Sequence, residues 1–201
     1  MPTGLRSLES PSYGGWGGRY NHVRENTWLD PVPEANYTYP EGRWFTRTAW
    51  GRSYMRDTYP ENSDLMHMYF KPITRWVDAL QNDFASRADW CVKSYDEANH
   101  TPIVLLNHPL DINAKANETV KLSAKGTYDP DGDELTYNWW QYEEADTYNG
   151  SVQIINTDKQ NTSFVVPDDV ITGDTIHIIC EVTDNGSPQL TRYQRVILTV
   201  E

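Results

Sequence analysis

Three aspartates alternate along the stretch YDPDGDELTYNWW; they are Asp129, Asp131 and Asp133. Carboxylate oxygens are the hard ligands that calcium prefers, and this spacing matches the first three ligand positions of an EF-hand loop. The rest of that loop is absent, because Glu134 stands where glycine is required and Trp140 where the bidentate glutamate would be. An EF-hand is excluded, while a calcium site built as a different oxygen cage, which could recruit Asp184, stays open.

The same residues also suit a turn between two strands. Proline presets φ for a turn, aspartate accepts nearby backbone N–H groups, and glycine tolerates positive φ, so DPDGD is typical of a strand connection. The sequence favours this structural interpretation over the metal site.

The aromatic run that follows alternates as a strand does. Leu135, Tyr137 and Trp139 face one way, while Trp140 and Tyr142 face the other. Trp139 is the expected core residue, because Leu135 shares its face. Trp140 and Tyr142 are then carbohydrate-binding candidates on an outer face, where aromatic rings stack on sugars or are covered by a neighbouring domain. We favour covering by a domain.

No residue is nominated for catalysis. The five histidines show no HExxH or other paired metal-ligand spacing, and no Gly-x-Ser-x-Gly elbow or phosphate-binding glycine loop occurs. His177 alternates with apolar residues and is predicted to be a sheet residue. Cys91 and Cys180 have no metal or redox spacing, so both are expected to be buried, small apolar residues.

The C-terminal half consists of short β-runs separated by turn residues such as Asp-Pro-Asp-Gly and Asp-Asn-Gly-Ser-Pro. This pattern is typical of an immunoglobulin-like antiparallel β-sandwich. The predicted strands are 103–106, 118–126, 134–142, 151–155, 162–167, 174–184 and 192–200.

A long amphipathic helix is predicted over residues 65–93. Its apolar residues recur at spacings of three, four and seven, and are Tyr69, Ile73, Trp76, Leu80, Phe84 and Cys91. Pro72 must lie in its first turn, because an interior proline would break the helix. The apolar stripe requires a partner surface, and residues 1–63, which show no persistent period, look too thin to supply it.

Composition excludes several classes of function. The formal net charge of −12 argues against nucleic acid, whose phosphates require a basic surface. No apolar run approaches the roughly 18 residues of a membrane span. The first residues, MPTGLRSLES, do not have the pattern of a signal peptide.

Several segments in order resemble a bacterial family of nucleoside-hydrolase-like proteins known as cellulose-binding. They are GGWGGRY (14–20), RWVDALQNDFASRADW (75–90), ANHTP (98–102), DPDGDELTYNWWQYEEADTY (129–148) and IHIICEVTDNGSPQLTRYQRVILTV (176–200). The resemblance covers nearly the whole chain. It implies that residues 1–97 form the C-terminal portion of a hydrolase-like α/β domain and residues 98–201 an immunoglobulin-like domain. The expected fold class is α+β overall.

The resemblance also implies a function. The chain is expected to be the C-terminal part of a carbohydrate-associated protein, secreted or periplasmic, with the β-sandwich as a glycan-binding (cellulose-binding) or accessory module. In the alternative, the full-length protein is an N-glycosyl hydrolase and this region is a cap without a ligand of its own. The expected partners are polysaccharide or the missing N-terminal domain. The catalytic aspartate cluster of nucleoside hydrolases, which binds calcium, has no match here, so no cofactor is expected in this chain.

Overall fold

The computed structural model describes residues 3–25, 27–29 and 71–201. The strands are β1 (Asn21–Arg24), β2 (Thr27–Leu29), β3 (Asp111–Ala114), β4 (Thr119–Ser123), β5 (Leu135–Gln141), β6 (Asn161–Val165), β7 (Thr175–Asp184) and β8 (Thr191–Val200). The helices are α4 (Val77–Asp89) and the short 3₁₀ turns η1 (Pro11–Tyr13), η2 (Tyr95–Glu97) and η3 (Glu143–Ala145). In these ranges no helix is long and apolar enough to cross a bilayer.

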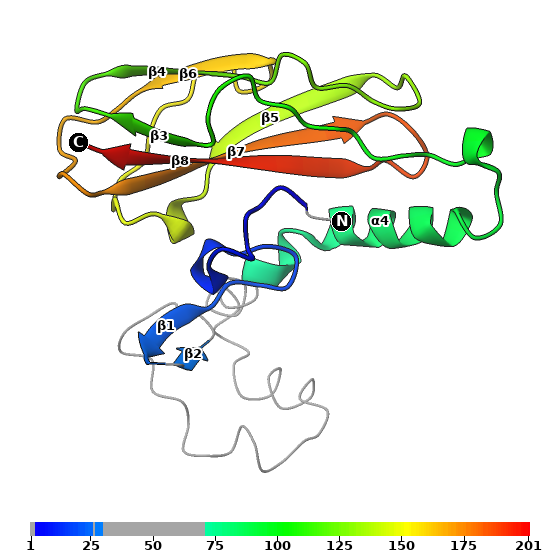
Figure 1. The fold of residues 1–201 in the computed structure, drawn as a ribbon, viewed down its shortest axis with the longest axis horizontal. Coiled ribbons are helices and arrows are strands. Elements are labelled where there is room, and N and C mark those ends of the chain that lie inside the picture. The colour runs from blue at the N-terminus through cyan, green and yellow to red at the C-terminus, as the bar shows by residue number, and fades with distance from the viewer. Residues whose placement is uncertain (1–2, 26, 30–70) are drawn as a thin grey trace, which may run out of the picture.

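Two sheets build the C-terminal half, here called the β region (residues 98–201). The larger sheet has the order β3-β8-β7-β5, in which β3 runs parallel to β8 and the other neighbours are antiparallel. The smaller sheet pairs β4 with β6. Figure 1 shows β4 and β6 on one side of the larger sheet and α4 with the N-terminal segment on the other.

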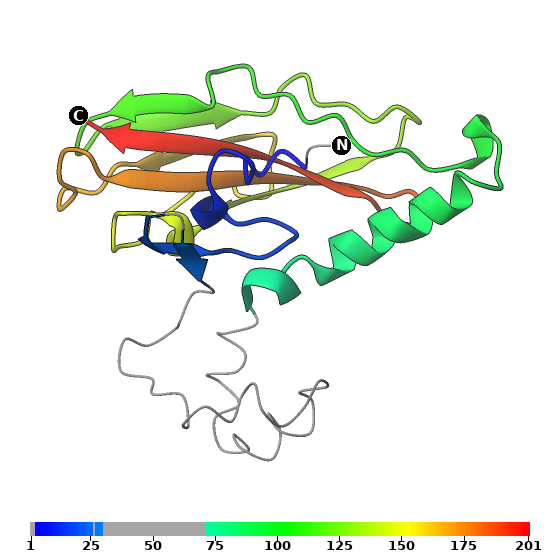
Figure 2. The same ribbon diagram turned by 60° about the horizontal axis from the view of Figure 1, so that its bottom comes forward.

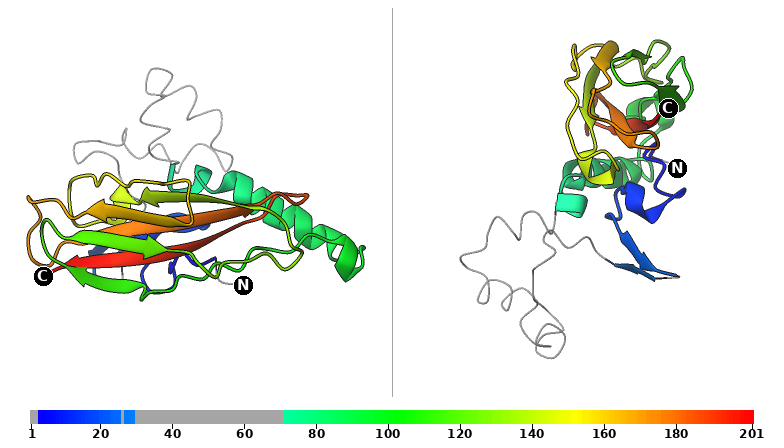
Figure 3. Two further views of the ribbon diagram at one scale, coloured as in Figure 1. Left: turned by 90° about the horizontal axis from the view of Figure 1, so that it is seen from above. Right: turned by 90° about the vertical axis from the view of Figure 1, so that its left-hand side faces the viewer.

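A shared apolar core lies between the two sheets. Trp139 of β5 is 1% exposed and packs in one cluster with Leu122 of β4, Phe164 of β6 and Ile178 of β7. Leu135 and Tyr137 pack against the same cluster, as their alternation with Trp139 predicts. The prediction of a mostly β C-terminal half is confirmed, and Figure 3 shows its layers from above and end-on.

Five of the predicted β-runs contain strands, and two do not. Residues 103–106 and 151–155 each make only an isolated bridge, through Ile103 and Ile155. The strand prediction for these runs is wrong, because neither run lies beside a neighbour that extends the ladder. Conversely, β3 (sequence DINA) was not predicted, although it pairs in parallel with the end of β8.

The predicted long helix is shorter and interrupted. Residues 71–74 are helical, residues 75–76 form a turn, and α4 begins at Val77. The helix ends at Asp89 rather than at 93, because the next residues form turns that lead into the capping box of Ser94 and Glu97. Residues 65–70 lie outside the described ranges.

Helix α4 and the turn before it face the larger sheet with only part of the predicted apolar stripe, because Trp76 is buried there but later residues of the stripe are not. Trp76, Asp83 and Ser86 are 2%, 5% and 0% exposed, whereas Leu80 and Phe84 of the stripe are 37% and 71% exposed. Ser86 is small and Asp83 is paired with Arg192 of β8, so polar and small side chains form part of the helix face that meets the sheet. Figure 2 shows α4 and the N-terminal segment across the same side of the sheet.

The two cysteines differ. Cys180 lies in the core between the sheets and is 0% exposed, but Cys91 is exposed. The prediction of burial is wrong for Cys91 because the helix ends before it. Its Sγ donates a 3.3 Å hydrogen bond to the carbonyl of Arg87 on the surface.

Candidate functional site

Trp140 and Tyr142 lie on the outer face of the larger sheet, as predicted, and Trp76, the residue before α4, packs against both rings. The centroid of the Trp76 ring lies 5.9 Å from that of Trp140 and 6.0 Å from that of Tyr142. Tyr193 of β8 completes this second aromatic cluster, at 5.3 Å from Trp76. Tyr142 is 1% exposed. Its ring therefore cannot stack on a sugar in this arrangement.

Cations surround the Tyr142 ring. The guanidinium of Arg75 lies 4.5 Å from the ring centroid and that of Arg195 lies 5.0 Å from it. Burial raises the pKa of the Tyr142 hydroxyl. A Cβ at Gly14 would lie 2.5 Å from that hydroxyl, so the N-terminal segment needs glycine where it closes over the ring.

Trp140, in contrast, lines an open groove of about 630 Å³ between α4 and the larger sheet. It is partly exposed, and its indole Nε1 donates a 3.0 Å hydrogen bond to Oε2 of Glu181. The groove is rich in polar side chains; they include Asn82, Gln141, Glu143, Glu144, Thr183 and Gln189. An aromatic ring among donors and acceptors is the composition of a site that binds a polar ligand with an apolar face.

Glu144 of the groove forms ion pairs with two cationic side chains. Its Oε1 accepts a 2.5 Å hydrogen bond from Arg75 and lies 2.6 Å from Nζ of Lys71. Burial raises the pKa of Glu144, but these cations outweigh it and hold the pKa below the usual value. Burial also raises the pKa of Glu181, and the bond from Trp140 opposes that shift. The hydrogen bond from Nε1 to Glu181 fixes the orientation of the Trp140 indole ring in the groove.

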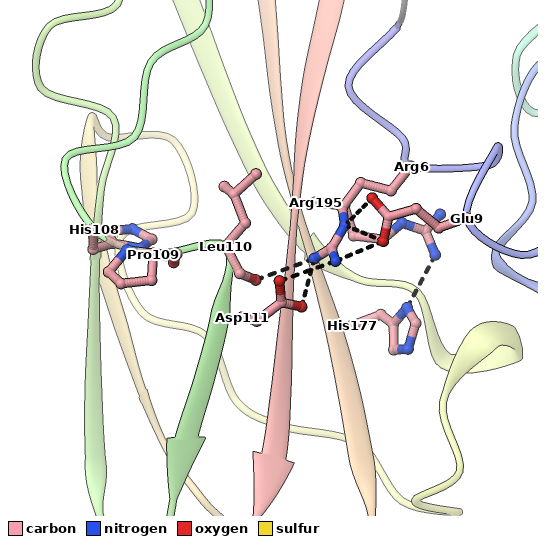
Figure 4. Close-up of polar contacts among 8 residues, drawn as sticks. All are labelled: Arg6, Glu9, His108, Pro109, Leu110, Asp111, His177 and Arg195. Carbon is pink, nitrogen blue, oxygen red and sulfur yellow. Dashed lines mark hydrogen bonds and ion pairs between the residues drawn. The ribbon is translucent and has the colours of Figure 1, made fainter.

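The N-terminal segment is anchored on the β region by the contacts drawn in Figure 4. Arg6 forms ion pairs with Glu9 and with Asp111 at the start of β3, at 2.7 and 2.8 Å. Arg195 of β8 is 0% exposed, lies 3.0 Å from the ring Nδ1 of His177, and donates to the carbonyl of Tyr13. Burial and the charge of Arg195 lower the pKa of His177 to about 3, so the ring is neutral. His177 is a sheet residue, as predicted.

The three aspartates of the opening motif come together after Tyr128. One oxygen from each of Asp129, Asp131 and Asp133 lies within 4.8 Å of the other two. Oδ1 of Asp129 accepts from the backbone N–H of Asp131 at 2.8 Å and of Asp133 at 3.3 Å, which is the hydrogen bonding of a turn. Turn geometry and a carboxylate cluster therefore occur in the same residues.

Two further segments meet this turn. Asp131 contacts His100 twice. Its Oδ2 accepts a 2.6 Å hydrogen bond from the backbone N–H of His100, and its Oδ1 lies 2.8 Å from the ring Nδ1 of His100. Asp184 is 1% exposed and accepts from the amide of Asn99 and from the backbone of Leu190. The motifs ANHTP, DPDGD and VTDNGSP, which are far apart in the sequence, thus share one end of the β region.

Sequence reasoning missed several residues at these sites. Arg75 and Glu181 of the groove and His100 beside the aspartates carry no local motif. His100 lies between two rings, 3.9 Å from the centroid of Tyr95 and 5.8 Å from that of Trp90. Only the pairing of β5 with β7, which places Trp140 opposite Ile179 and near Glu181, could have indicated the Trp140–Glu181 bond.

Comparison with known proteins gives two strong similarities. Residues 119–200 match the family described as cellulose-binding protein Sde0182, C-terminal domain. A solved structure of a nucleoside hydrolase-related hypothetical protein from Saccharophagus degradans, associated with carbohydrate metabolism, is 33% identical with a TM-score of 0.73. The match covers 100% of this chain and 45% of that one, so the chain spans less than half of that protein. The resemblance predicted from the sequence is confirmed.

Other solved structures are less similar. The PKD domain of the KIAA 1837 protein is 15% identical with a TM-score of 0.32, over 45% of this chain and 79% of that domain. The Ig1 domain of mouse SynCAM 2 is 16% identical with a TM-score of 0.28, over 50% and 94%. No curated protein matches the chain significantly.

Proposed function

We propose that this chain, whose residues 119–200 match the C-terminal domain family of cellulose-binding protein Sde0182, is the C-terminal part of a carbohydrate-associated, nucleoside-hydrolase-like protein, secreted or periplasmic. In this proposal residues 1–97 complete the hydrolase-like domain. Residues 98–201 form an immunoglobulin-like sandwich that binds glycan. The groove at Trp140 is the binding site.

The observation that carries the proposal is the position of Trp140. Its indole is held by Glu181, is partly exposed, and lies in a groove of polar side chains between α4 and the sheet. A sugar ring has an apolar C–H face that stacks on an aromatic ring, and hydroxyls at its edge that exchange hydrogen bonds with side chains. Tyr142, the other carbohydrate-binding candidate, is assigned to packing because it is buried against Trp76.

Binding to insoluble cellulose and to a panel of other glycans tests the proposal. Trp140→Ala should raise Kd roughly fivefold to tenfold, because it removes the stacking surface. Trp140→Phe should retain most binding. Phe84→Ala is the matched control: Phe84 is an aromatic residue on α4 that is 71% exposed and does not line the groove.

Two results would reject the glycan proposal. One is failure of the wild-type chain to bind any glycan. The other is equal binding by wild type and Trp140→Ala. Thermal melting of each variant must accompany the assay, because Trp140 also contacts the ring of Trp76.

A second candidate function has its own support. Apolar side chains are exposed along α4 and the turn before it: Ile73, Val77, Leu80 and Phe84 are 48%, 40%, 37% and 71% exposed. Such a stripe favours a cap that completes an N-glycosyl hydrolase, with the missing N-terminal domain packed on α4.

Thiol labelling distinguishes the two functions. Phe84→Cys in a Cys91→Ser background should react with a thiol reagent in this chain. If the region is a cap, the same thiol should be protected in the chain extended by its upstream sequence. Equal reactivity in both would exclude packing of a preceding domain on this face.

A further inference from the structure

The turn between Tyr128 and β5 has the geometry of a site for a large divalent cation. The ligand oxygens of Asp129, Asp131 and Asp133 all lie within 4.8 Å of one another. Calcium binds oxygen at about 2.3–2.6 Å, so two ligands on opposite sides of the ion are roughly 4.6–5.2 Å apart. Magnesium binds at about 2.0–2.1 Å, so its opposite ligands are only roughly 4.2 Å apart. Ligand oxygens separated by up to 4.8 Å are within the span that one calcium ion bridges.

Asp129 carries an oxygen that the turn does not explain. The residue is 9% exposed, and its Oδ1 accepts the two backbone N–H groups of the turn. Its Oδ2 is buried and has no hydrogen-bond partner among the described residues. A buried carboxylate oxygen without a partner is costly, and native proteins rarely retain one unless an ion or water meets it.

Negative charge is concentrated around this oxygen. One carboxylate oxygen from each of Asp129, Asp131 and Asp133 lies within 4.8 Å of the other two. Asp184 is 1% exposed and lies next to Asn185, which accepts a hydrogen bond from the backbone N–H of Glu134 at the end of the turn. Among the residues that the structure describes, the basic side chain that pairs with the cluster is His100, through Asp131. Carboxylates held this close without a matching set of cations favour a divalent ion between them.

We propose that calcium binds between Asp129, Asp131 and Asp133, with Oδ2 of Asp129 as its buried ligand. The site is independent of the aspartate cluster of nucleoside hydrolases, which has no match in this chain. The ion would hold the turn closed and would oppose the repulsion that the three carboxylates exert on one another and on Asp184.

Calcium at this position would also stabilise the junction between α4 and the β region. Asp131 binds His100, and the indole Nε1 of Trp90, at the C-terminal end of α4, donates a 2.8 Å hydrogen bond to the carbonyl of Asn99. The adjacent amide of Asn99 binds Asp184 and the carbonyl of Pro188. Ordering the aspartate turn therefore orders residues 99–100, which follow the helix.

Thermal melting and isothermal titration calorimetry of the chelator-treated chain, residues 1–201, test this proposal with CaCl₂ and MgCl₂ as the probes. Calcium should raise Tm by roughly 5–10 °C at 100 times Kd. Magnesium at the same concentration should raise it by less than half as much. Saturable heat should appear with calcium at a Kd no weaker than about 1 mM, the weak end of extracellular calcium modules.

Three variants make the test specific. Asp133→Asn should abolish the calcium-dependent rise while leaving the calcium-free Tm unchanged or higher. It removes one repelling charge, and among the described residues Asp133 takes part in the turn through its backbone N–H rather than its carboxylate. Asp129→Asn should also abolish it. Asp158→Asn is the matched control: Asp158 is exposed, pairs only with neighbouring Lys159 among the described contacts, and should leave the rise intact.

The proposal fails if wild-type Tm is unchanged up to about 10 mM calcium, ten times the weakest expected Kd. It also fails if Asp133→Asn retains the full rise, because calcium then binds elsewhere. Should Asp129→Asn unfold the chain, Asp133→Asn alone decides, since Asp133 is only partly buried and its carboxylate does not accept the hydrogen bonds of the turn. Neither result would affect the glycan proposal, whose groove contains none of these residues.

Discussion

Removal of the Asp83 carboxylate should destabilise the chain more than any surface substitution. Asp83 of α4 accepts a 2.5 Å hydrogen bond from Arg192 of β8, and both side chains are over nine-tenths buried, at 7% and 8% exposed. Arg87, one helical turn later, binds the other oxygen of Asp83 at 2.6 Å but is 45% exposed. The Asp83–Arg192 pair is therefore the buried polar link between α4 and the β region.

Among the described residues, Asp83→Ala leaves the buried Arg192 guanidinium with one hydrogen-bond acceptor, the carbonyl of Thr191. Loss of one partner from a buried pair costs about 3–5 kcal/mol, out of a total stability of about 5–15 kcal/mol. Arg192→Met leaves Asp83 paired with Arg87 and should cost about 1–3 kcal/mol. The double variant Asp83→Ala with Arg192→Met should cost at least about 2 kcal/mol less than the sum.

Urea unfolding followed by tryptophan fluorescence at pH 7 measures these free energies of unfolding. Burial raises the pKa of Asp83, but hydrogen bonds from Arg87 and Arg192 outweigh it and hold the pKa below its usual value. A lowered carboxyl pKa gives stability that is present above the unfolded pKa and is lost as pH falls through the folded one. The penalty of Asp83→Ala should therefore shrink below about pH 4. A penalty under about 1 kcal/mol, or additive single effects, would refute a dry, docked interface.

Three further predictions use the same chain. Trp76→Ala should cost about 3–5 kcal/mol in the urea assay, because Trp76 is 2% exposed in the second cluster; a cost below about 1 kcal/mol would show that α4 is undocked in solution. The pKa of His177 is lowered to about 3 in the folded chain, so between pH 3 and 6.5 the unfolded chain binds more protons than the folded one. The free energy of unfolding therefore decreases as the pH is lowered through this range. The penalty of His177→Gln should therefore shrink by about 1.4 kcal/mol per pH unit from pH 6.5 to 4, and a constant penalty would contradict a buried neutral imidazole. A thiol reagent should modify Cys91 in the native chain and Cys180 only after denaturation, since Cys180 is buried and burial raises its pKa; rapid double labelling would be inconsistent with the core.

The strands that were predicted well are those in which core-facing and outward-facing side chains alternate within the strand's own sequence. Trp139 is in the core with Leu135, as period-two alternation requires, and β5, β7 and β8 begin and end within one residue of their predicted ranges. These strands pair with neighbours along most of their length. Where a run lacks such a neighbour, as at 103–106, apolar composition alone does not make a strand.

The face of α4 could not be predicted from hydropathy. The residues that contact the sheet include Asp83 and Ser86, which a hydrophobic stripe excludes. Asp83 is buried because Arg192 is opposite it, a pairing that joins residues 109 positions apart. The hydrophobic periodicity of one segment does not show whether another segment supplies an opposite charge that allows a carboxylate to be buried.

The candidate sites also divide into features contained in one segment, which the sequence predicts, and features that depend on distant segments, which it does not. The spacing of Asp129, Asp131 and Asp133 is contained in five residues, and the structure brings their oxygens together. The groove depends on which residue of β7 lies beside Trp140, and so on the register of β5 against β7. Trp140 was a candidate from its strand position, while Glu181 was not.

Helix α4 connects the two proposed sites, because it contributes to both. Arg75 and Trp76, at its N-terminal end, line the glycan groove, and Trp90, at its C-terminal end, binds the segment that holds Asp131. A variant that undocks the helix, such as Asp83→Ala, should therefore weaken glycan binding and calcium-dependent melting together. Asp133→Asn should remove only the calcium effect. Loss of glycan binding in Asp133→Asn would show instead that the turn, rather than the helix, controls the groove.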